Sequence, residues 1–477
     1  MKLSTIAISV AVIIGGAAVG GSWYTGKQVE QRYNEIVEMG NHHLKQLAIY
    51  GVDAQIKNVK LERHFFSSDV SYQLEVKAED DAFVFQGNDK LFHGPFPINR
   101  LTQGKLTPML MSAESHISVP EQLKGYFARA ELLNAVTHIN YSGNASGQFT
   151  TSSFKNDQAP WYVSEIAAEF DVEKSGKYDV ALKVPSVMSQ DDETKVQLEG
   201  IEYQLKGELA KHSGYPNLTL GDYVFNLKSI HVTGSDPIQN PDNIVVSFKN
   251  LTSKGYAKIQ EKRYISEGDG EMDVVMGSKE TQTNFGKVKM DMLFTGDASS
   301  FDKLYAIYPD LFKNPDNPQV VVEMEKAVQA FLANGVTLNL KHLSLENSKG
   351  KSELGLNLNL TLPDFSQSKN LAEILNIFKQ SQLTTSLNLA SAQELMTQFY
   401  ALNQQTKANA EHLAKENILL LIDSAQQSGL AKVDAEKIQL KLEIDQGKVK
   451  LNGNEVPEEQ VQTALFMIAL SLGSLGM

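Results

Sequence analysis

The first candidate for a reactive site is the stretch LFHGPFPINRL, residues 91–101. It places His93 in a Gly-Pro loop among aromatic and aliphatic side chains. Such a histidine could act as a general base or metal ligand if a carboxylate or second histidine lay within reach. The sequence identifies no such partner. A corner between strands fits the same residues, because Gly94 permits unusual dihedral angles and Pro95 and Pro97 interrupt ladder pairing. We favour the corner over the reactive loop.

Other arrangements of polar residues are weaker candidates for chemistry. His42 and His43 are adjacent on a helical pattern, so they point about 100° apart and cannot bind one metal as an i,i+4 pair does. The acidic run 269–273 resembles the start of a calcium loop, but Val274 occupies the position where the sharp turn needs glycine. Motifs of zinc proteases, serine hydrolases and nucleotide-binding loops are absent. We therefore expect no catalytic residue, metal or cofactor, and no enzyme activity.

Composition narrows the class of protein. The 477 residues carry a net charge of −13 and are 42% hydrophobic, which is typical of a globular protein with a core. This charge argues against binding of nucleic acid, which needs clustered Lys and Arg. The chain has no cysteine, which excludes disulfides, thiol catalysis and cysteine-bound zinc. The length is enough for two or three folding units.

The uncharged segment 3–24 has the length that a helix needs to cross a bilayer. Trp23 and Tyr24 end it where an aromatic belt would lie, and Lys27 follows. A cleaved signal peptide is the alternative, with a small-residue site at 18–20. We favour a retained anchor. Because no other apolar run could return the chain, we expect a single-pass protein with its body outside the cytoplasm.

The elements after the anchor change in period. Residues 27–49 read as an amphipathic helix, a stalk that lifts the body off the membrane. In ELGLNLNLTL, residues 353–362, every second residue is leucine, which indicates a strand with one dry and one wet face. Similar alternation recurs along the chain. We expect an α+β fold of long, mainly antiparallel sheets with one apolar face, packed by several helices, after an N-terminal transmembrane helix.

Helical patterns occur at several places, and the predicted organisation follows from them. The longest pattern, 393–429, ends at Gly429, a suitable C-terminal glycine. The other helical patterns are 121–136, 300–312, 320–333, 369–380 and 457–470. The predicted domains are a transmembrane anchor at 1–26, a helical stalk at 27–50, a β-rich N-terminal module at 51–240 and an α+β C-terminal module at 241–477.

The leucine faces of these strands must be covered. Helices could cover them and form a closed core, which is the reading that we favour. Alternatively, a curled sheet could leave an apolar groove for lipid or another hydrophobic ligand. Such a groove would be lined by Leu354, Leu356, Leu358 and Leu360.

Five stretches together resemble one bacterial family. They are SWYTGKQVE at 22–30, HFFSS at 64–68, HGPFP at 93–97 (His93, Gly94, Pro95, Phe96 and Pro97), NYSGNASG at 140–147 and GKVKLNG at 447–453. In order and spacing they resemble the YdgA/YihF family of inner-membrane-associated proteins of unknown biochemical function. The resemblance implies a retained anchor and a periplasmic body, and it brings no catalytic residues with it.

The functional expectation combines these observations. We expect a non-enzymatic inner-membrane protein whose periplasmic body acts in envelope organisation or protein interaction. Self-association could use the glycine spacing of Gly16 and Gly20 or an exposed sheet edge. The alternative is a carrier or binder of lipid in a sheet-lined groove. A hydrolase that uses His93 is a third hypothesis, which would require an acidic partner for His93 inside a pocket.

Overall fold

The computed structural model describes most of the chain after the N-terminal segment. The described residues are 37–38, 40–41, 44–45, 52–78, 81–156, 161–191, 194–209, 214–234, 245–277, 282–313, 315, 317–362, 375–402 and 405–463. They form two compact units, of which the first comprises 1–239 with 302–324 and the second 240–301 with 325–477. The expected anchor, and most of the expected stalk, lie outside the described residues.

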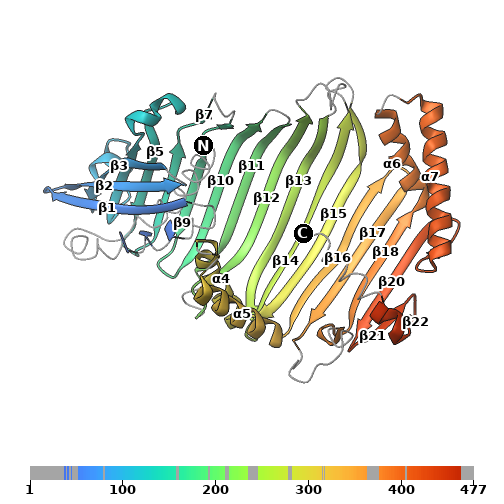
Figure 1. The fold of residues 1–477 in the computed structure, drawn as a ribbon. Helices are drawn as coiled ribbons and strands as arrows, with labels where there is room; N and C mark the ends of the chain where they lie inside the picture. The colour runs from blue at the N-terminus through green and yellow to red at the C-terminus, as the bar shows by residue number, and fades with distance from the viewer. Residues whose placement is uncertain are drawn as a thin grey trace. The chain divides into compact units, whose positions relative to one another are not determined.

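The first unit is an antiparallel sheet in which almost every strand pairs with the next one along the chain (Figure 1). The short β8 pairs with β10 and with β7. Helical turns occur at α3 (Ile98–Leu101) and at the 3-10 helix η2 (Glu121–Tyr126). The strands are β1 (Val52–Arg63), β2 (Ser67–Ala78), β3 (Asp81–His93), β4 (Met111–Ser118), β5 (Glu131–Ile139), β6 (Ala145–Thr151), β7 (Phe154–Asn156), β8 (Trp161–Val163), β9 (Ala167–Val172), β10 (Lys177–Gln190), β11 (Thr194–Leu209) and β12 (Thr219–Gly234).

The sheet of the first unit encloses its own core. Side chains of β1–β3 and of β6–β10 share one hydrophobic cluster that includes Val76, Phe85 and Phe149. Alternation in DAFVFQG buries Phe83 and Phe85 and turns the residues between them outward. Leu44, from the segment expected to be a stalk, is buried in this cluster, so that part of the chain packs against the sheet.

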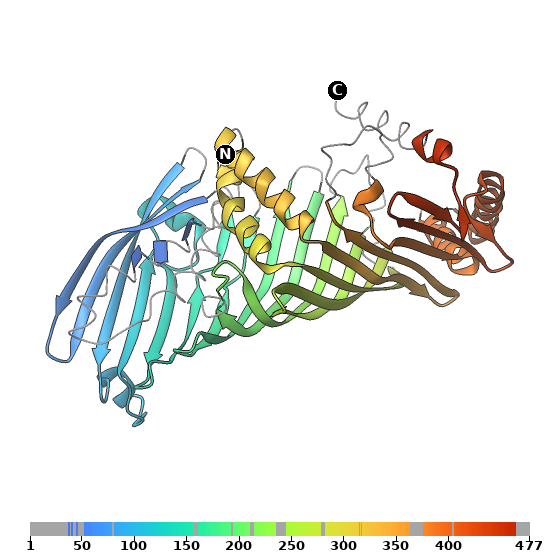
Figure 2. The ribbon, with the colours of Figure 1, turned by 90° about the horizontal axis from the view of Figure 1, so that it is seen from below.

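The second unit is also an antiparallel sheet, running from β13 through β18 to β20 and β21. Its strands lie in a single layer in Figure 2. The strands are β13 (Val245–Gln260), β14 (Arg263–Gly277), β15 (Gln282–Asp297), β16 (Val336–Asn347), β17 (Gly350–Leu360), β18 (Ser381–Asn388), β19 (Lys432–Val433), β20 (Lys437–Asp445), β21 (Lys448–Leu451) and β22 (Asn454–Glu455).

Four helices accompany the strands of this part of the chain. They are α4 (Ala298–Lys313), α5 (Pro318–Ala333), α6 (Leu389–Leu402) and α7 (Lys407–Ser428). Residues 302–324 of α4, its following loop and α5 group with the first unit. The prediction of long, mainly antiparallel sheets is confirmed, as are the helices at 300–312 and 320–333. The strand predicted at 353–362 is confirmed as far as Leu360, where β17 ends.

Two helix predictions need correction. The pattern at 393–429 is not one helix, because α6 ends at Leu402 and a new helix, α7, begins at Lys407. The Thr406 hydroxyl caps α7 by accepting a hydrogen bond from the Asn409 N–H. The predicted C-terminal glycine is confirmed, since Gly429 ends α7 in the left-handed conformation. The pattern at 121–136 is wrong beyond η2, because β5 starts at Glu131 and buries alternate residues from there on.

Candidate functional site

The HGPFP stretch is a corner between neighbouring strands. Strand β3 ends at His93, and the chain returns to the sheet as β4 at Met111. The Gly94 N–H donates to the Leu110 carbonyl at 2.9 Å, the Met109 N–H donates to the Pro95 carbonyl at 2.9 Å, and the Gly94–Pro95 peptide bond is cis. Thus the corner is held by backbone hydrogen bonds across its base, as the structural interpretation of the sequence requires.

His93 is fixed by the neighbouring hairpin. Its backbone N–H donates to the Phe66 carbonyl at 2.9 Å, and its Nε2 lies 3.0 Å from the Ser68 hydroxyl. Partial burial lowers the pKa of His93, with Arg63 adding to the effect and a backbone hydrogen bond at Phe65 opposing it. Among the described residues, His93 has a buried serine and no carboxylate as its side-chain partner.

A second polar chain lies under the corner, built from residues that sequence reasoning missed. The Asn99 side-chain amide donates to Glu114 Oε1 and to the Ser112 hydroxyl, both at 2.9 Å. The Ser112 hydroxyl in turn lies 3.0 Å from His138 Nδ1. Because Asn99 donates to Ser112, the serine can donate to Nδ1. The α3 turn thereby covers the outer face of β4 with a connected hydrogen-bond chain.

This chain is better suited to fixing the corner than to catalysis. Two serine–histidine pairs are present, but Ser68 and Ser112 are only 3% and 0% exposed, so a substrate could not reach either hydroxyl. Burial lowers the pKa of His138, and the charge of Arg100 adds to this effect. No cluster of three or more metal-ligating side chains occurs among the described residues. These hydrogen bonds therefore fix the backbone of the corner between β3 and β4.

The sequence carries only a weak signal for the residues that hold the corner. Asn99 and Arg100 stand out as polar residues within the quoted stretch, and both are buried, at 8% and 6% exposed. Ser112, Glu114 and His138 come from later strands, and only the pairing of β4 with β5 brings them beneath α3. Position in the sheet, rather than residue type, therefore selects these partners.

One carboxylate on β3 is unusual in its burial. The Oδ1 atom of Asp89 is inaccessible to solvent and has no hydrogen-bond partner. Burial raises the pKa of Asp89 to about 6, against the opposing effects of a hydrogen bond from Ser115 and the charge of His116. Its cross-strand neighbour on β2 is the buried Val70. Burial therefore raises the pKa of Asp89 more than Ser115 and His116 lower it.

The second candidate site is a face of the second unit's sheet. Residues that pair across neighbouring strands point to the same face of a sheet. One row of such pairs runs through Gly255, Gly268, Met292, Leu340, Leu356, Leu383, Leu442 and Leu451. A neighbouring row contains Met290, Leu343, Leu354 and Leu440. With Leu358 and Leu360 of β17, these residues are called the apolar face below. It includes all four leucines predicted to line a groove.

The apolar face is only partly covered. Met290 and Met292 are each 41% exposed, and the leucines of β17 are partly buried. The borders of the apolar face are covered by helices, and at one of them Leu387 and Ile438 pack with α6 and α7. At another border Leu442 and Ile444 pack with Val461. The prediction of a fully closed core is therefore not met over β15–β17.

The opposite face of the same sheet is polar and paired. Lys287 lies 2.7 Å from Glu271, and Lys254 lies 4.0 Å from Asp269. A hydrogen bond from Lys287 lowers the pKa of Glu271. The acidic run 269–273 thus lies on strand β14 with lysine partners, which confirms a strand rather than a calcium loop. The two faces differ as sharply as the alternation of residues predicts.

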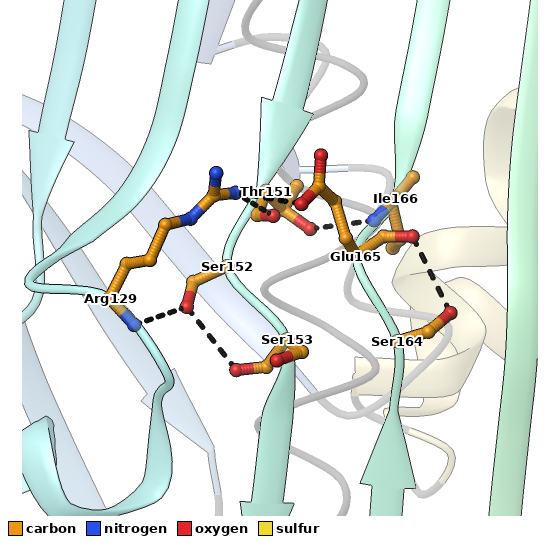
Figure 3. A network of polar contacts seen from close by, with 7 residues as sticks. All are labelled: Arg129, Thr151, Ser152, Ser153, Ser164, Glu165 and Ile166. Atoms are coloured by element: carbon orange, nitrogen blue, oxygen red, sulfur yellow. Dashed lines mark hydrogen bonds and ion pairs between the residues drawn. The ribbon is translucent and has the colours of Figure 1, made fainter.

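A third polar network spans the interruptions between short strands of the first unit (Figure 3). The Arg129 N–H donates to the Ser152 hydroxyl at 2.9 Å, and its guanidinium donates to the Thr151 carbonyl. The guanidinium also lies 3.4 Å from Glu165. The Ile166 N–H donates to the Thr151 hydroxyl at 3.1 Å. These bonds satisfy backbone groups where β6 stops and β9 begins, which is a structural role.

The remaining predicted site residues lie at the N-terminus. Trp23, Tyr24 and Lys27, expected at a membrane interface, are outside the described residues. Within the part of the chain that the structure describes, no helix is both long enough and apolar enough to cross a membrane.

Comparisons with known proteins place the chain in a family. Residues 1–459 match the family described as "Bacterial protein of unknown function (DUF945)". Protein YdgA of Escherichia coli (strain K12) is 23% identical over 99% of this chain and 98% of its own length. The uncharacterized protein YihF of the same organism is 20% identical over 95% and 96%, respectively.

Shorter similarity extends to another species. An uncharacterized protein of Haemophilus influenzae is 24% identical over 40% of this chain and 54% of its own length. No solved structure matches the chain. The resemblance to the YdgA/YihF family is confirmed, and the chain belongs to the DUF945 family of bacterial proteins of unknown function.

Proposed function

We propose that this protein binds a lipid or another hydrophobic molecule on the apolar face, as a single-pass inner-membrane protein with its body in the periplasm. The observation that carries the proposal is the continuous row of Met and Leu side chains across β15–β20, with Met290 and Met292 each 41% exposed. Soluble proteins rarely leave contiguous apolar surface in contact with water unless it binds something.

The composition of the face suits a flexible apolar ligand. Methionine side chains are unbranched and polarizable, so they adapt to ligands of varied shape. The row begins at Gly255 and Gly268, which carry no side chain and leave the backbone of β13 and β14 beside Met292. Each CH₂ group of an acyl chain that leaves water there would contribute about 0.8 kcal/mol. No catalytic group adjoins this face among the described residues, so we propose binding rather than turnover.

The test of binding compares the two faces of one strand. In Met290→Gln/Met292→Gln the side chains keep their length but become polar, so a fluorescent fatty acid should bind the full chain at least about tenfold more weakly. The matched control is Leu293→Gln on the opposite face of β15, which should leave the Kd unchanged. Equal binding by the double variant and the wild-type chain would contradict the proposal, as would no binding by the wild-type chain.

Membrane association is a separate part of the proposal. It rests on the uncharged segment 3–24 with Trp23, Tyr24 and Lys27 at its end. The protein should stay in the membrane fraction in high salt and at alkaline pH, and should leave it in detergent. Release by salt alone would remove the anchor from the account without affecting ligand binding on the apolar face.

A second candidate function is protein interaction within the envelope, without a hydrophobic small molecule. The observation that favours it is a set of exposed apolar side chains on the α6–α7 hairpin, where Phe399 is 52%, Leu419 52% and Leu420 63% exposed. Under this candidate, Leu419→Lys/Leu420→Lys would reduce self-association of the full chain in analytical ultracentrifugation. A monomeric wild-type chain would rule out self-association by this hairpin.

A further inference from the structure

The first unit carries a second exposed apolar surface, formed by two loops at one end of its sheet. One loop is the turn at 64–66 between β1 and β2, and the other is the corner 94–110 between β3 and β4. The hydrogen bond from the His93 N–H to the Phe66 carbonyl joins their bases. The pairing of Ser67 with Phe92 brings the start of β2 level with the end of β3 at this end of the sheet. Together the two loops are called the aromatic end.

Large apolar side chains on the aromatic end are strongly exposed. Phe65 is 87% and Phe66 60% exposed, and their rings pack edge to face with centroids 4.6 Å apart. Phe96 is 47% and Leu106 70% exposed. Ile98, at 49%, lies on the same corner. This concentration on two adjacent loops is unlike the single exposed apolar residues that any protein surface carries.

The charge of the aromatic end differs from that of the chain. Segments 63–67 and 94–110 contain Arg63, Arg100 and Lys105 and no Asp or Glu, in a chain whose net charge is −13. Arg63 and Lys105 are exposed. The nearby Asp69 is bound by His64 at 2.9 Å. The aromatic end therefore presents two exposed cations, Arg63 and Lys105, beside its exposed aromatic residues, and the exposed Glu62 precedes Arg63 on β1.

We propose that the aromatic end inserts into the interface of a lipid bilayer that contains anionic headgroups. Aromatic and aliphatic side chains on projecting turns can enter the boundary between headgroups and acyl chains, while Arg63 and Lys105 contact the phosphates. Because Phe65 is almost fully exposed on a convex turn, a deformable bilayer suits it better than a preformed protein pocket. The inference uses the proposed membrane location and is independent of ligand binding on the apolar face.

The absence of cysteine makes a direct test simple, because any introduced cysteine is the only site for a spin label. Labels are placed by Phe66→Cys and Phe96→Cys, and by Val84→Cys as the control, which is 40% exposed on β3 of the same unit. The full chain is reconstituted in nanodiscs of phosphatidylcholine, with or without phosphatidylglycerol. Collision rates with oxygen and with a water-soluble nickel chelate then report the depth of each label.

The expected result is that labels at 66 and 96 collide more with oxygen and less with nickel in discs that contain phosphatidylglycerol, whereas the label at 84 stays aqueous. Phe65→Ser and Lys105→Gln, introduced beside the label at 96, should return it toward water. Aqueous labels at 66 and 96 in both kinds of disc would overturn the proposal. So would immobilisation of these labels in detergent without lipid, since that would identify a second copy as the partner. Chains that fail to co-purify with discs would instead refute the proposed anchor.

Discussion

At the scale of single residues, the HGPFP corner depends on close approach of backbone to backbone. A Cβ atom at Gly94 would lie 2.0 Å from the Met109 carbonyl oxygen and 2.8 Å from that of Leu110. These backbone atoms cannot move without opening the base of the corner. The glycine is thus required by space at this position.

Gly94→Ala should lower the free energy of unfolding of the first unit by roughly 2–3 kcal/mol, because the new methyl group displaces the β3–β4 connection. Urea denaturation followed by the fluorescence of Trp161, which packs against the core of this unit, measures the change. Gly125→Ala is the matched control, since a Cβ there meets nothing within 4 Å. Equal stability of the two variants would show that the corner is not held as described.

Asp89 predicts how stability changes with pH. Its folded pKa of about 6 lies above the ordinary value of 3.8, so the folded state binds this proton more tightly than the unfolded state does. Its contribution to stability is fully present below about pH 4 and is lost as pH rises through 6. The loss amounts to about 3 kcal/mol at most.

Asp89→Asn should therefore remove this fall in stability between pH 4 and pH 6.5 in the Trp161 unfolding transition. The amide cannot ionise, so its stability relative to the wild-type chain should increase with pH across the same window. A wild-type slope that persists unchanged in the variant would assign the pH dependence to other groups.

The corner itself could be predicted from the sequence, but its partners could not. Gly and Pro at 94, 95 and 97 have backbone properties that are readable without a fold. Asn99, Ser112 and His138 form a hydrogen-bond chain only because β4 and β5 pair in one register beneath α3. Such pairing is set by the whole sheet, which a local pattern does not encode.

At the scale of elements, alternation was the most informative signal. Leucines at every second position of 354–360 identified β17 and its apolar face, because side chains of a strand alternate between two faces. Helix ends were less predictable. The pattern at 393–429 continues in phase across the α6–α7 break, and only the capping residue Thr406 marks the second start.

An aromatic cluster joins helix ends to the edge of the second unit's apolar face. Phe331 of α5 lies with its ring centroid 5.6 Å from Phe301 and 6.1 Å from Phe294 of β15. Tyr264 of β14 contacts Phe301 at 4.8 Å. The cluster closes one border of the face and leaves Met290 and Met292 beyond it.

Phe331→Ala should destabilise the second unit by about 3 kcal/mol, because it removes the ring that two neighbours pack against. Val328→Ala on the same helix is the control, since Val328 is 39% exposed and should change stability by less than about 1 kcal/mol. Thermal unfolding followed by circular dichroism compares the two. A smaller loss for Phe331→Ala than for Val328→Ala would mean that the cluster does not fix the helix.

At the scale of the whole molecule, the two units differ in how they treat apolar side chains. The first unit curls its sheet around a buried cluster that includes Leu74, Val76 and Phe85. The sheet of the second unit keeps its Met and Leu rows partly exposed between covered borders. Alternation of residues in the sequence predicted strands in both units. It could not predict which faces would be covered, because the elements that pack on a face are set by the tertiary fold.

The central claim is that a hydrophobic molecule occupies the apolar face, and site-specific photocrosslinking tests it most directly. A benzophenone amino acid is placed at Leu356, on the apolar face of β17, or at its neighbour Asn357, which points to the polar face. After illumination in living cells, mass spectrometry of the intact chain measures any adduct. The account predicts an adduct of lipid mass at 356 and none at 357. Adducts of protein mass at 356, or no difference between the two positions, would contradict it.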